Sequence, residues 1–270
     1  MVSRCLRVAM AVAALTMLGA GLRPDTRAPE RDPAEAADRV LVFTRTAGFR
    51  HDSIPDGVAA IRALGAAHGF GVDQTEDPTV FTDAGLAAHR AVVFLSTTGP
   101  VLEAEQQAAF ERYIRNGGGF VGIHAASDTE YDWPWYGGLV GAYFSGHPAV
   151  QAAILNVEDR THPSTVALPD PWVRTDEWYS FRTNPRDVGV HVLLTLDEAS
   201  YTGGAMGADH PMAWYHLYDG GRAWYTAIGH TSESFAEPLF VAHLLGGIQY
   251  AAALLPDGAN AVYHEHDTRG

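Results

Sequence analysis

The first half of the chain alternates short apolar runs with amphipathic stretches, which constrains the fold more than any other feature. An unbroken apolar run such as residues 91–96 is typical of a strand buried on both faces of a parallel sheet. The pattern predicts strands at 39–44, 70–75, 91–96 and 119–124. It also predicts helices at 53–68, with Ser53 as N-cap, and at 102–116. This alternation indicates βαβ units and therefore an α/β fold.

The pattern changes in the second half, where strand-like segments follow one another without long helices. They lie at 150–157, 172–181, 190–196, 212–218 and 223–228, and a turn at 219–221 makes the last two a hairpin. A final helix is predicted at 235–255. We therefore expect one domain over residues 38–255, with a mostly parallel central sheet and extra β-strands in its C-terminal half. Residues 29–37 read as a linker and 256–270 as a tail.

The first residues are typical of an export signal. Arg4 and Arg7 precede the apolar run 8–22, which is shorter than the roughly 20 residues of a membrane span but suits a signal-peptide core. We expect a signal peptide over residues 1–28, a secreted protein and no stable membrane insertion; the alternative is an uncleaved anchor. The only cysteine, Cys5, precedes this run, so the mature chain would have no disulfide and no cysteine ligand for zinc.

Composition excludes several classes of function. The 18 basic residues are all arginine, and 32 acidic residues give a net charge of −14. This charge disfavours binding to nucleic acids or anionic membranes, and the lack of lysine excludes Schiff-base chemistry. The glycine-rich segment 117–122 follows a predicted helix and opens a strand, the reverse of a dinucleotide-binding motif, so no nucleotide cofactor is expected.

Histidine is the most informative residue type, with 13 in the chain. His51, His124 and His230 each follow a predicted strand, where parallel sheets place their chemistry. If these strands are neighbours, the three imidazoles converge. They would then bind a divalent metal such as zinc or serve as general acid and base, whereas isolated histidines there would be local polar caps.

Acidic and aromatic residues accompany these histidines. Asp176 and Glu177 lie inside the predicted strand 172–181, and such carboxylates either pair with a nearby arginine or point into a site. The aromatic-rich segment 131–136 is expected to be a loop that either stacks on sugar rings or packs against the sheet edge. The histidines and carboxylates at 264–267 would chelate a metal only weakly, because such tails are mostly solvated.

Several motifs in order resemble the ThuA-like (trehalose utilisation) family of the class I glutamine amidotransferase-like superfamily. They are GFRHDSI at 48–54, GIHAAS at 122–127, GAYFSGHP at 141–148, DRTHP at 159–163, DEWY at 176–179, PMAW at 211–214 and GRAWY at 221–225. The resemblance covers about 39–253 and implies a flavodoxin-like three-layer sandwich. In true amidotransferases a nucleophilic cysteine follows the strand corresponding to 119–124. His124 stands there, and imidazole cannot form the glutamyl thioester, so this chain is not expected to be a glutamine amidotransferase.

The resemblance implies work on trehalose, related disaccharides and their 3-keto derivatives. We expect an exported enzyme that cleaves the glycosidic bond of a 3-keto disaccharide or glycoside, by hydrolysis or elimination. The alternative is a non-catalytic carbohydrate-binding or accessory module, with a small sugar as partner in either case. The expected catalytic residues are His51, His124, Glu177 and His230, the three histidines also being the candidate metal ligands. The expected substrate-binding residues are Arg50, Asp128, Trp133, His147 and Tyr179.

Overall fold

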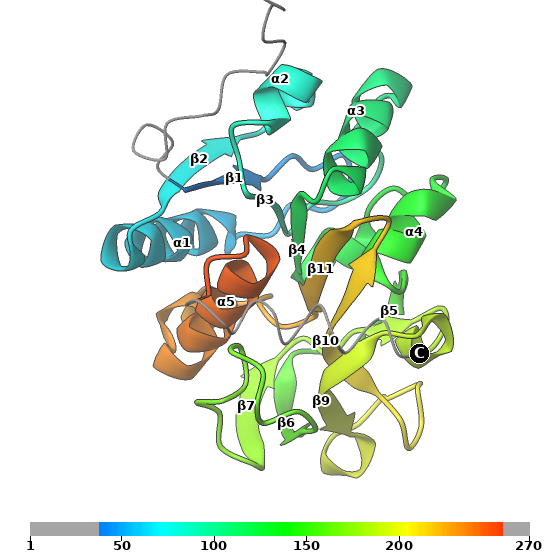
Figure 1. Ribbon diagram of the computed structural model, residues 1–270. Helices are drawn as coiled ribbons and strands as arrows, with labels where there is room; N and C mark the ends of the chain where they lie inside the picture. Colours follow the sequence, from blue (N-terminus) through cyan, green and yellow to red (C-terminus); the bar gives the residue numbers. More distant parts are fainter. Residues whose placement is uncertain (1–37, 256–270) are drawn as a thin grey trace, which may run out of the picture. The chain divides into compact units, whose positions relative to one another are not determined.

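A computed structural model describes residues 38–255 of the chain (Figure 1). The predicted signal peptide (1–28), linker (29–37) and tail (256–270) lie outside the described residues. Within 38–255, no helix has the length and apolar character needed to cross a membrane.

The core is a nine-stranded sheet with the order β2-β1-β3-β4-β11-β10-β9-β6-β7. Its first five strands in that order are parallel to one another, and the remaining neighbours are antiparallel. A separate two-stranded ribbon pairs β5 with β8. The strands are β1 Arg39–Phe43, β2 Gly71–Thr75, β3 Ala91–Leu95, β4 Gly119–Ile123, β5 Phe144–Gly146, β6 Gln151–Val157, β7 Trp172–Asp176, β8 Ser180–Phe181, β9 His191–Asp197, β10 Pro211–Tyr218 and β11 Gly221–Thr226.

Helices cover both faces of the parallel part of the sheet. Figure 1 shows α1 (Ile54–His68) and α5 (Pro238–Ala251) on one side, with α3 (Ala104–Arg115) and α4 (Pro134–Val140) on the other. The short α2 (Asp83–Leu86) packs beside α3. Five 3₁₀ helices lie at Pro78–Val80, His124–Asp128, Pro185–Val188, Glu198–Ser200 and Ser232–Ala236. This arrangement confirms the expected α/β three-layer sandwich with extra strands.

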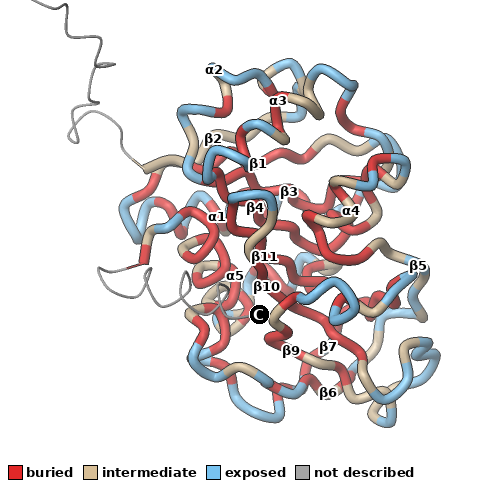
Figure 2. Tube along the Cα trace, turned by 45° about the vertical axis from the view of Figure 1, so that its right-hand side comes forward, coloured by how far each residue is buried: buried red, intermediate tan, exposed pale blue. Residues whose placement is uncertain are grey.

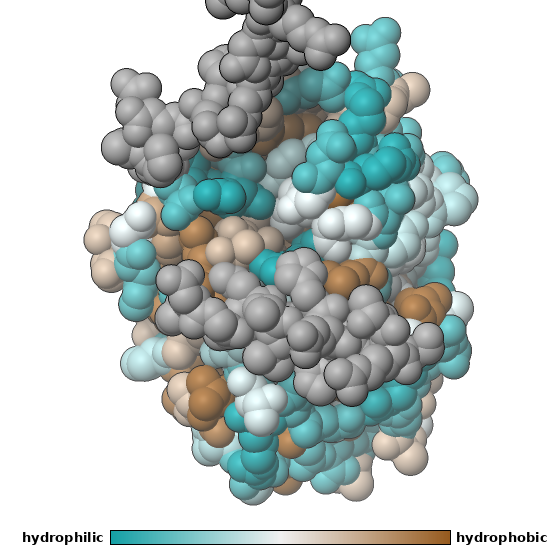
Figure 3. Space-filling model, viewed as in Figure 1, coloured by the Kyte–Doolittle hydropathy of each residue, from teal (hydrophilic) through white to brown (hydrophobic). Residues whose placement is uncertain are grey.

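The central strands are buried because helices cover both of their faces. Every residue of β3, β4 and β11 is buried, as the red tube of Figure 2 shows. Phe94 of β3 lies in a cluster of aromatic rings that joins the sheet to α3. In Figure 3 hydrophilic side chains gather over α2 and α3, which present their polar faces outward. The continuous apolar runs of the sequence thus correspond to strands buried on both sides.

Three predicted elements differ from the structure. The strand predicted at 172–181 ends at Asp176, because the Asp176 carboxylate accepts the backbone N–H of Glu177, and the chain resumes as β8. The final helix begins at Pro238 rather than at residue 235, because a proline is favoured at a helix start and disfavoured in its interior. The aromatic segment 131–136, expected to be a loop, contains the first turn of α4, which Pro134 opens.

The direction of β7 decides where its C-terminal residues lie. Four antiparallel pairings, β11–β10, β10–β9, β9–β6 and β6–β7, separate β7 from β11, so both strands run in the same direction. This half of the sheet also curls back, since the carboxylate of Asp176 accepts the N–H of Gly229 just beyond β11. The ends of β1, β4, β11 and β7 therefore meet at one edge.

Candidate metal centre

Four side chains converge at this edge. His51 follows β1, His124 directly follows β4, His230 follows β11 and Glu177 follows β7. One donor atom from each residue can be chosen so that all four atoms lie within 4.8 Å of one another. Three of the residues are buried and His230 is partly exposed, so the group faces solvent on one side. The structure brings together all four residues predicted as catalytic.

His124 is held in a fixed orientation by the backbone. Its φ of +52° lies in the left-handed region, which is unusual for a residue with a side chain and marks a sharp turn from β4 into the 3₁₀ helix His124–Asp128. Its Nδ1 lies 2.7 Å from the carbonyl oxygen of Ala227. A carbonyl only accepts, so Nδ1 carries the hydrogen. In the neutral ring, Nε2 therefore presents a lone pair to the other three residues.

The other two histidines turn a ring nitrogen toward the same point. Nε2 of His51 lies 3.1 Å from Nε2 of His124, and Nδ1 of His230 lies 3.3 Å from it. Burial, followed by the neighbouring His124 and His230, lowers the pKa of His51 to about 3. His51 is therefore neutral at physiological pH and keeps a nitrogen lone pair available for a ligand.

Glu177 supplies the negative charge of the cluster. Its Oε2 lies 3.0 Å from Nδ1 of His230 and 3.5 Å from Nε2 of His124. Burial opposes ionisation, but the neighbouring imidazoles of His124 and His230 outweigh it and lower the pKa of Glu177 to about 2. The hydrogen bond that His230 donates to Glu177 in turn raises the pKa of His230. A carboxylate beside three imidazoles suits a divalent cation such as zinc.

Two observations support a metal ion at this point. In a tetrahedral zinc site with metal–ligand distances of about 2.0–2.1 Å, donor atoms lie about 3.4 Å apart. Four donor separations here run from 3.0 to 3.5 Å. In addition, Nδ1 of His51 is buried without a hydrogen-bond partner. If its hydrogen is on Nδ1, the His51 and His124 lone pairs face each other at 3.1 Å, an arrangement that a cation between them stabilises.

Two predicted substrate-binding residues lie beside the cluster. Nδ1 of His147 is 3.0 Å from Oε1 of Glu177, the carboxylate oxygen that does not face the other histidines, and its side chain is 40% exposed. The ring of Tyr179 lies over His124, with centroids 4.2 Å apart, and also contacts Phe144. His147 is thus the accessible imidazole next to the four-residue group.

The other three predicted substrate-binding residues make their polar side-chain contacts with residues outside the cluster. Arg50 is exposed and forms an ion pair with Glu76. Asp128 accepts a hydrogen bond from the hydroxyl of Tyr131.

Trp133 is buried, stacks on the neighbouring rings of Trp135 and Tyr136, and donates its N–H to Glu111 of α3. Trp133 therefore packs between α3 and α4 rather than at the cluster.

The structure also shows residues that the sequence interpretation missed. The ring of Phe49 is 66% exposed and meets His51 edge-on at 4.9 Å, so an apolar surface borders the cluster. Phe144 is partly buried and contacts Tyr179, whose ring lies over His124. Asp176, considered as a carboxylate paired with an arginine or directed into a site, forms an ion pair with Arg174, and only its neighbour Glu177 enters the cluster. The sequence signal available for Phe49 was an aromatic residue two positions before a histidine that follows a predicted strand.

Comparisons with known proteins agree with this fold. A ThuA-like protein from Bacteroides uniformis ATCC 8492 superposes with a TM-score of 0.71 at 25% identity, covering 86% of this chain and 97% of its own. A ThuA-like protein from Parabacteroides merdae ATCC 43184 gives 0.67 at 21% identity, covering 80% and 90%. A cold-adapted β-galactosidase from Rahnella sp. R3 shares only the fold, with a TM-score of 0.50 at 15% identity, covering 79% and 31%. No match is found among curated proteins.

A family model settles the relationship at the level of sequence. The model described as ThuA, trehalose utilisation, matches residues 39–251, which is nearly the whole of the domain described above. The match includes all four residues of the cluster. The chain therefore belongs to the ThuA (trehalose utilisation) family.

Proposed function

We propose that the protein is a metal-dependent enzyme that cleaves the glycosidic bond of an oxidised sugar, such as a 3-keto disaccharide or glycoside. The observation that carries this proposal is the convergence of three imidazoles and one carboxylate at the partly open edge of the sheet. Membership of a family described by trehalose utilisation supports a sugar as the substrate. The exposed ring of Phe49 supports it too, since flat apolar surfaces suit the faces of sugar rings.

The chemistry follows from the acidity of a C–H bond next to a keto group. A base removes that proton, and the electron pair forms a C=C bond. The C–O bond to the leaving sugar then breaks, at the carbon two positions away from the keto carbon. The departing oxygen then takes up a proton. A divalent cation in the cluster would supply Lewis acidity for the charge that develops on the keto oxygen. Water adding to the C=C bond would complete a net hydrolysis.

His147 is the residue best placed to move the proton. It is partly exposed, so a substrate can reach it, and the remaining oxygen of Glu177 holds its Nδ1. An imidazole whose Nδ1 is held in this way leaves Nε2 to accept and return a proton, as a general acid–base group must. His51 and His124 are buried and face the centre of the cluster, so they suit holding a cation rather than exchanging protons with a substrate.

The test is an assay of full-length protein purified without a histidine tag. Chelator-treated enzyme is reloaded with zinc or manganese and given 3-keto-trehalose, with trehalose as the unoxidised control. We expect turnover of the keto sugar only, abolished by His124→Ala. His89→Ala is the matched control, because His89 also faces a carboxylate, that of Asp73 at 3.0 Å. Binding of the keto sugar without turnover under any metal would contradict the enzyme and favour the carbohydrate-binding module.

We further propose that the enzyme is exported. The support is the sequence of residues 1–28, which has the basic start and apolar core of a signal peptide. Expression of the full chain in a bacterial host, followed by mass analysis of extracellular and periplasmic fractions, tests this. Cleavage between residues 20 and 28 is expected, and an intact chain confined to the cytoplasm would contradict export.

A further inference from the structure

The carboxylate of Asp176 is the most heavily used acceptor next to the cluster. Its side chain is fully buried. Oδ1 accepts the backbone N–H of Glu177 at 2.9 Å and that of His230 at 3.0 Å. Oδ2 accepts the N–H of Gly229 at 3.1 Å and the hydroxyl of Ser234 at 3.0 Å. Asp176 thus joins two segments of chain that each carry a residue of the cluster.

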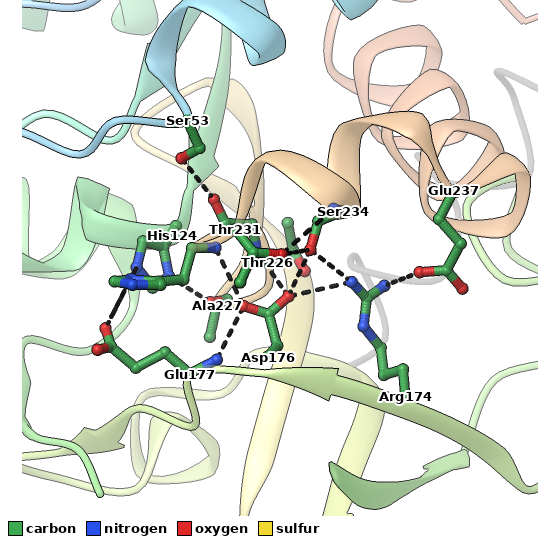
Figure 4. A network of polar contacts seen from close by, with 12 residues as sticks. Ser53, His124, Arg174, Asp176, Glu177, Thr226, Ala227, Thr231, Ser234 and Glu237 are labelled. Atoms are coloured by element: carbon green, nitrogen blue, oxygen red, sulfur yellow. Dashed lines mark hydrogen bonds and ion pairs between the residues drawn. The ribbon is translucent and has the colours of Figure 1, made fainter. Parts of the chain in front are cut away.

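These two segments are far apart in sequence and have no common strand pairing. Glu177 follows β7, the outermost strand of the sheet, whereas His230 follows β11, a strand in the middle of the sheet order. The backbone bonds to Asp176 bring the two segments together, and Figure 4 shows its carboxylate between them. The separation of 3.0 Å between Glu177 Oε2 and His230 Nδ1 is therefore coupled to the position of Asp176.

Asp176 is itself held from the opposite side. Arg174 donates to Oδ2 of Asp176 at 3.0 Å and to the hydroxyl of Ser234 at 2.8 Å. The same guanidinium forms an ion pair with Glu237 at the start of α5. Charge-assisted hydrogen bonds are stronger than neutral ones, and a buried carboxylate needs such partners. The network in Figure 4 therefore extends from α5 to the cluster.

We propose that Asp176 is a positioning residue that holds Glu177 and His230 at the spacing required to bind a divalent cation. Asp176 does not face the cation site. It acts through the backbone N–H groups of the two residues that do. This inference rests on the proposed metal centre. Residues that orient metal ligands typically contribute 10- to 100-fold to metal affinity, and the same range is expected here.

The experiment compares Asp176→Asn with wild-type full-length protein. Zinc affinity is measured by competition with a chromophoric chelator, and stability by urea unfolding of the zinc-free proteins. The asparagine amide would place N–H groups against the donors of Gly229 and Arg174, so we expect zinc affinity to fall 10- to 100-fold. Amide hydrogen exchange in the zinc-free protein is expected to quicken at 229–231 and 177–179.

Glu130→Gln is the matched control. Glu130 is also a buried carboxylate that anchors backbone, because it accepts the N–H groups of Val101 and Leu102 at 2.7 Å each. This variant removes a comparable buried charge at the start of α3 instead of beside the cluster. We expect it to lose stability with zinc affinity unchanged. Equal zinc affinity in Asp176→Asn and wild type would overturn the proposal, as would an equal fall in both variants.

A milder variant keeps the test decisive if Asp176→Asn does not fold. Ser234→Ala removes one hydrogen bond to Asp176 and one from Arg174, and leaves the carboxylate in place. We expect a several-fold loss of zinc affinity, and an unchanged value would overturn the proposal. If wild-type protein binds no divalent metal, the proposed metal centre and this inference are both overturned. If wild type binds zinc and the zinc affinity is unchanged in both Asp176→Asn and Ser234→Ala, this inference alone is overturned.

Discussion

The Nε2 atoms of His51 and His124 face each other at 3.1 Å inside the protein. Neither ring can reach water there, since His124 is fully buried and His51 nearly so. The hydrogen of His124 lies on Nδ1, which bonds to the carbonyl of Ala227, so one lone pair of this facing pair is already directed inward. Two imidazoles in this relation could supply two of the four ligands of a divalent cation.

Divalent metal should raise the thermal stability of the protein through this site. A ligand that binds only the folded state at about 100 times its dissociation constant adds about 2.7 kcal/mol. We expect zinc to raise the melting temperature of chelator-treated wild type, and His124→Ala to abolish that rise and the bound metal. Calorimetry with elemental analysis measures both, and His89→Ala is the control. A zinc response that persists in His124→Ala would place the metal elsewhere.

Replacing His147 should affect turnover rather than metal content. His147 contacts Glu177 through Nδ1 but is outside the group of four converging donors. A general acid or base contributes about 10²- to 10⁴-fold to the rate, so we expect His147→Gln to lower kcat by at least about 100-fold. Metal stoichiometry should stay at the wild-type value. Loss of metal in this variant would instead make His147 a ligand.

Removing the exposed ring of Phe49 should weaken sugar binding. The ring borders His51 and presents an apolar face to solvent. Loss of a stacking contact worth about 1 kcal/mol predicts about a fivefold rise in KM for Phe49→Ala, with kcat and metal content nearly unchanged. Val188→Ala is the control, because Val188 is another exposed apolar residue. Identical KM values for the two variants would exclude Phe49 from the substrate site.

Acid should destabilise the protein through a buried histidine that is not part of the candidate metal centre. His243 of α5 is fully buried, its Nδ1 lies 2.7 Å from the carbonyl of Ser164, and burial lowers its pKa to about 3. Unfolded histidine titrates near 6.5, so between pH 6.5 and 3 the unfolded chain binds the proton that the folded protein excludes. Stability from this group is therefore present above pH 6.5 and falls as the pH drops.

The size of this effect is about 2 kcal/mol between pH 7 and pH 5. We expect His243→Gln to be less stable than wild type at pH 7. Between pH 7 and pH 5 its free energy of unfolding should fall by about 2 kcal/mol less than that of wild type. Urea unfolding of chelator-treated protein at the two pH values measures it. His68→Gln, at an exposed position at the end of α1, should retain the wild-type pH dependence. Parallel losses in wild type and His243→Gln would contradict the assignment.

The sequence predicted the parallel half of the fold well because its strands are buried on both faces. Continuous apolar runs leave little ambiguity, and β3 (Ala91–Leu95) ends one residue before its predicted limit. The same logic located His51, His124 and His230, since the carboxyl ends of parallel strands share one edge. Local chemistry is what the pattern could not show. The break after Asp176 depends on a side chain bonding to its own backbone neighbour.

Long-range contacts account for the remaining differences. Trp133 is in an aromatic segment that suited either sugar stacking or packing, and only the position of α3 decides that it packs against Glu111. The role of Asp176 depends on β7 curling back toward β11, which no local pattern encodes. Glu177 could be named as a candidate because a carboxylate is rare in an apolar segment, but its partners follow from the tertiary fold.

The number of strands between β11 and β7 has a consequence for any rearrangement of this fold. Each antiparallel step reverses the chain, so an even number of steps returns Glu177 to the edge that carries the three histidines. Inserting or deleting one strand there would send Glu177 to the opposite edge. The antiparallel extension can therefore grow or shrink only by whole hairpins if the cluster is to keep its carboxylate, which gives protein engineers a parity rule for this scaffold.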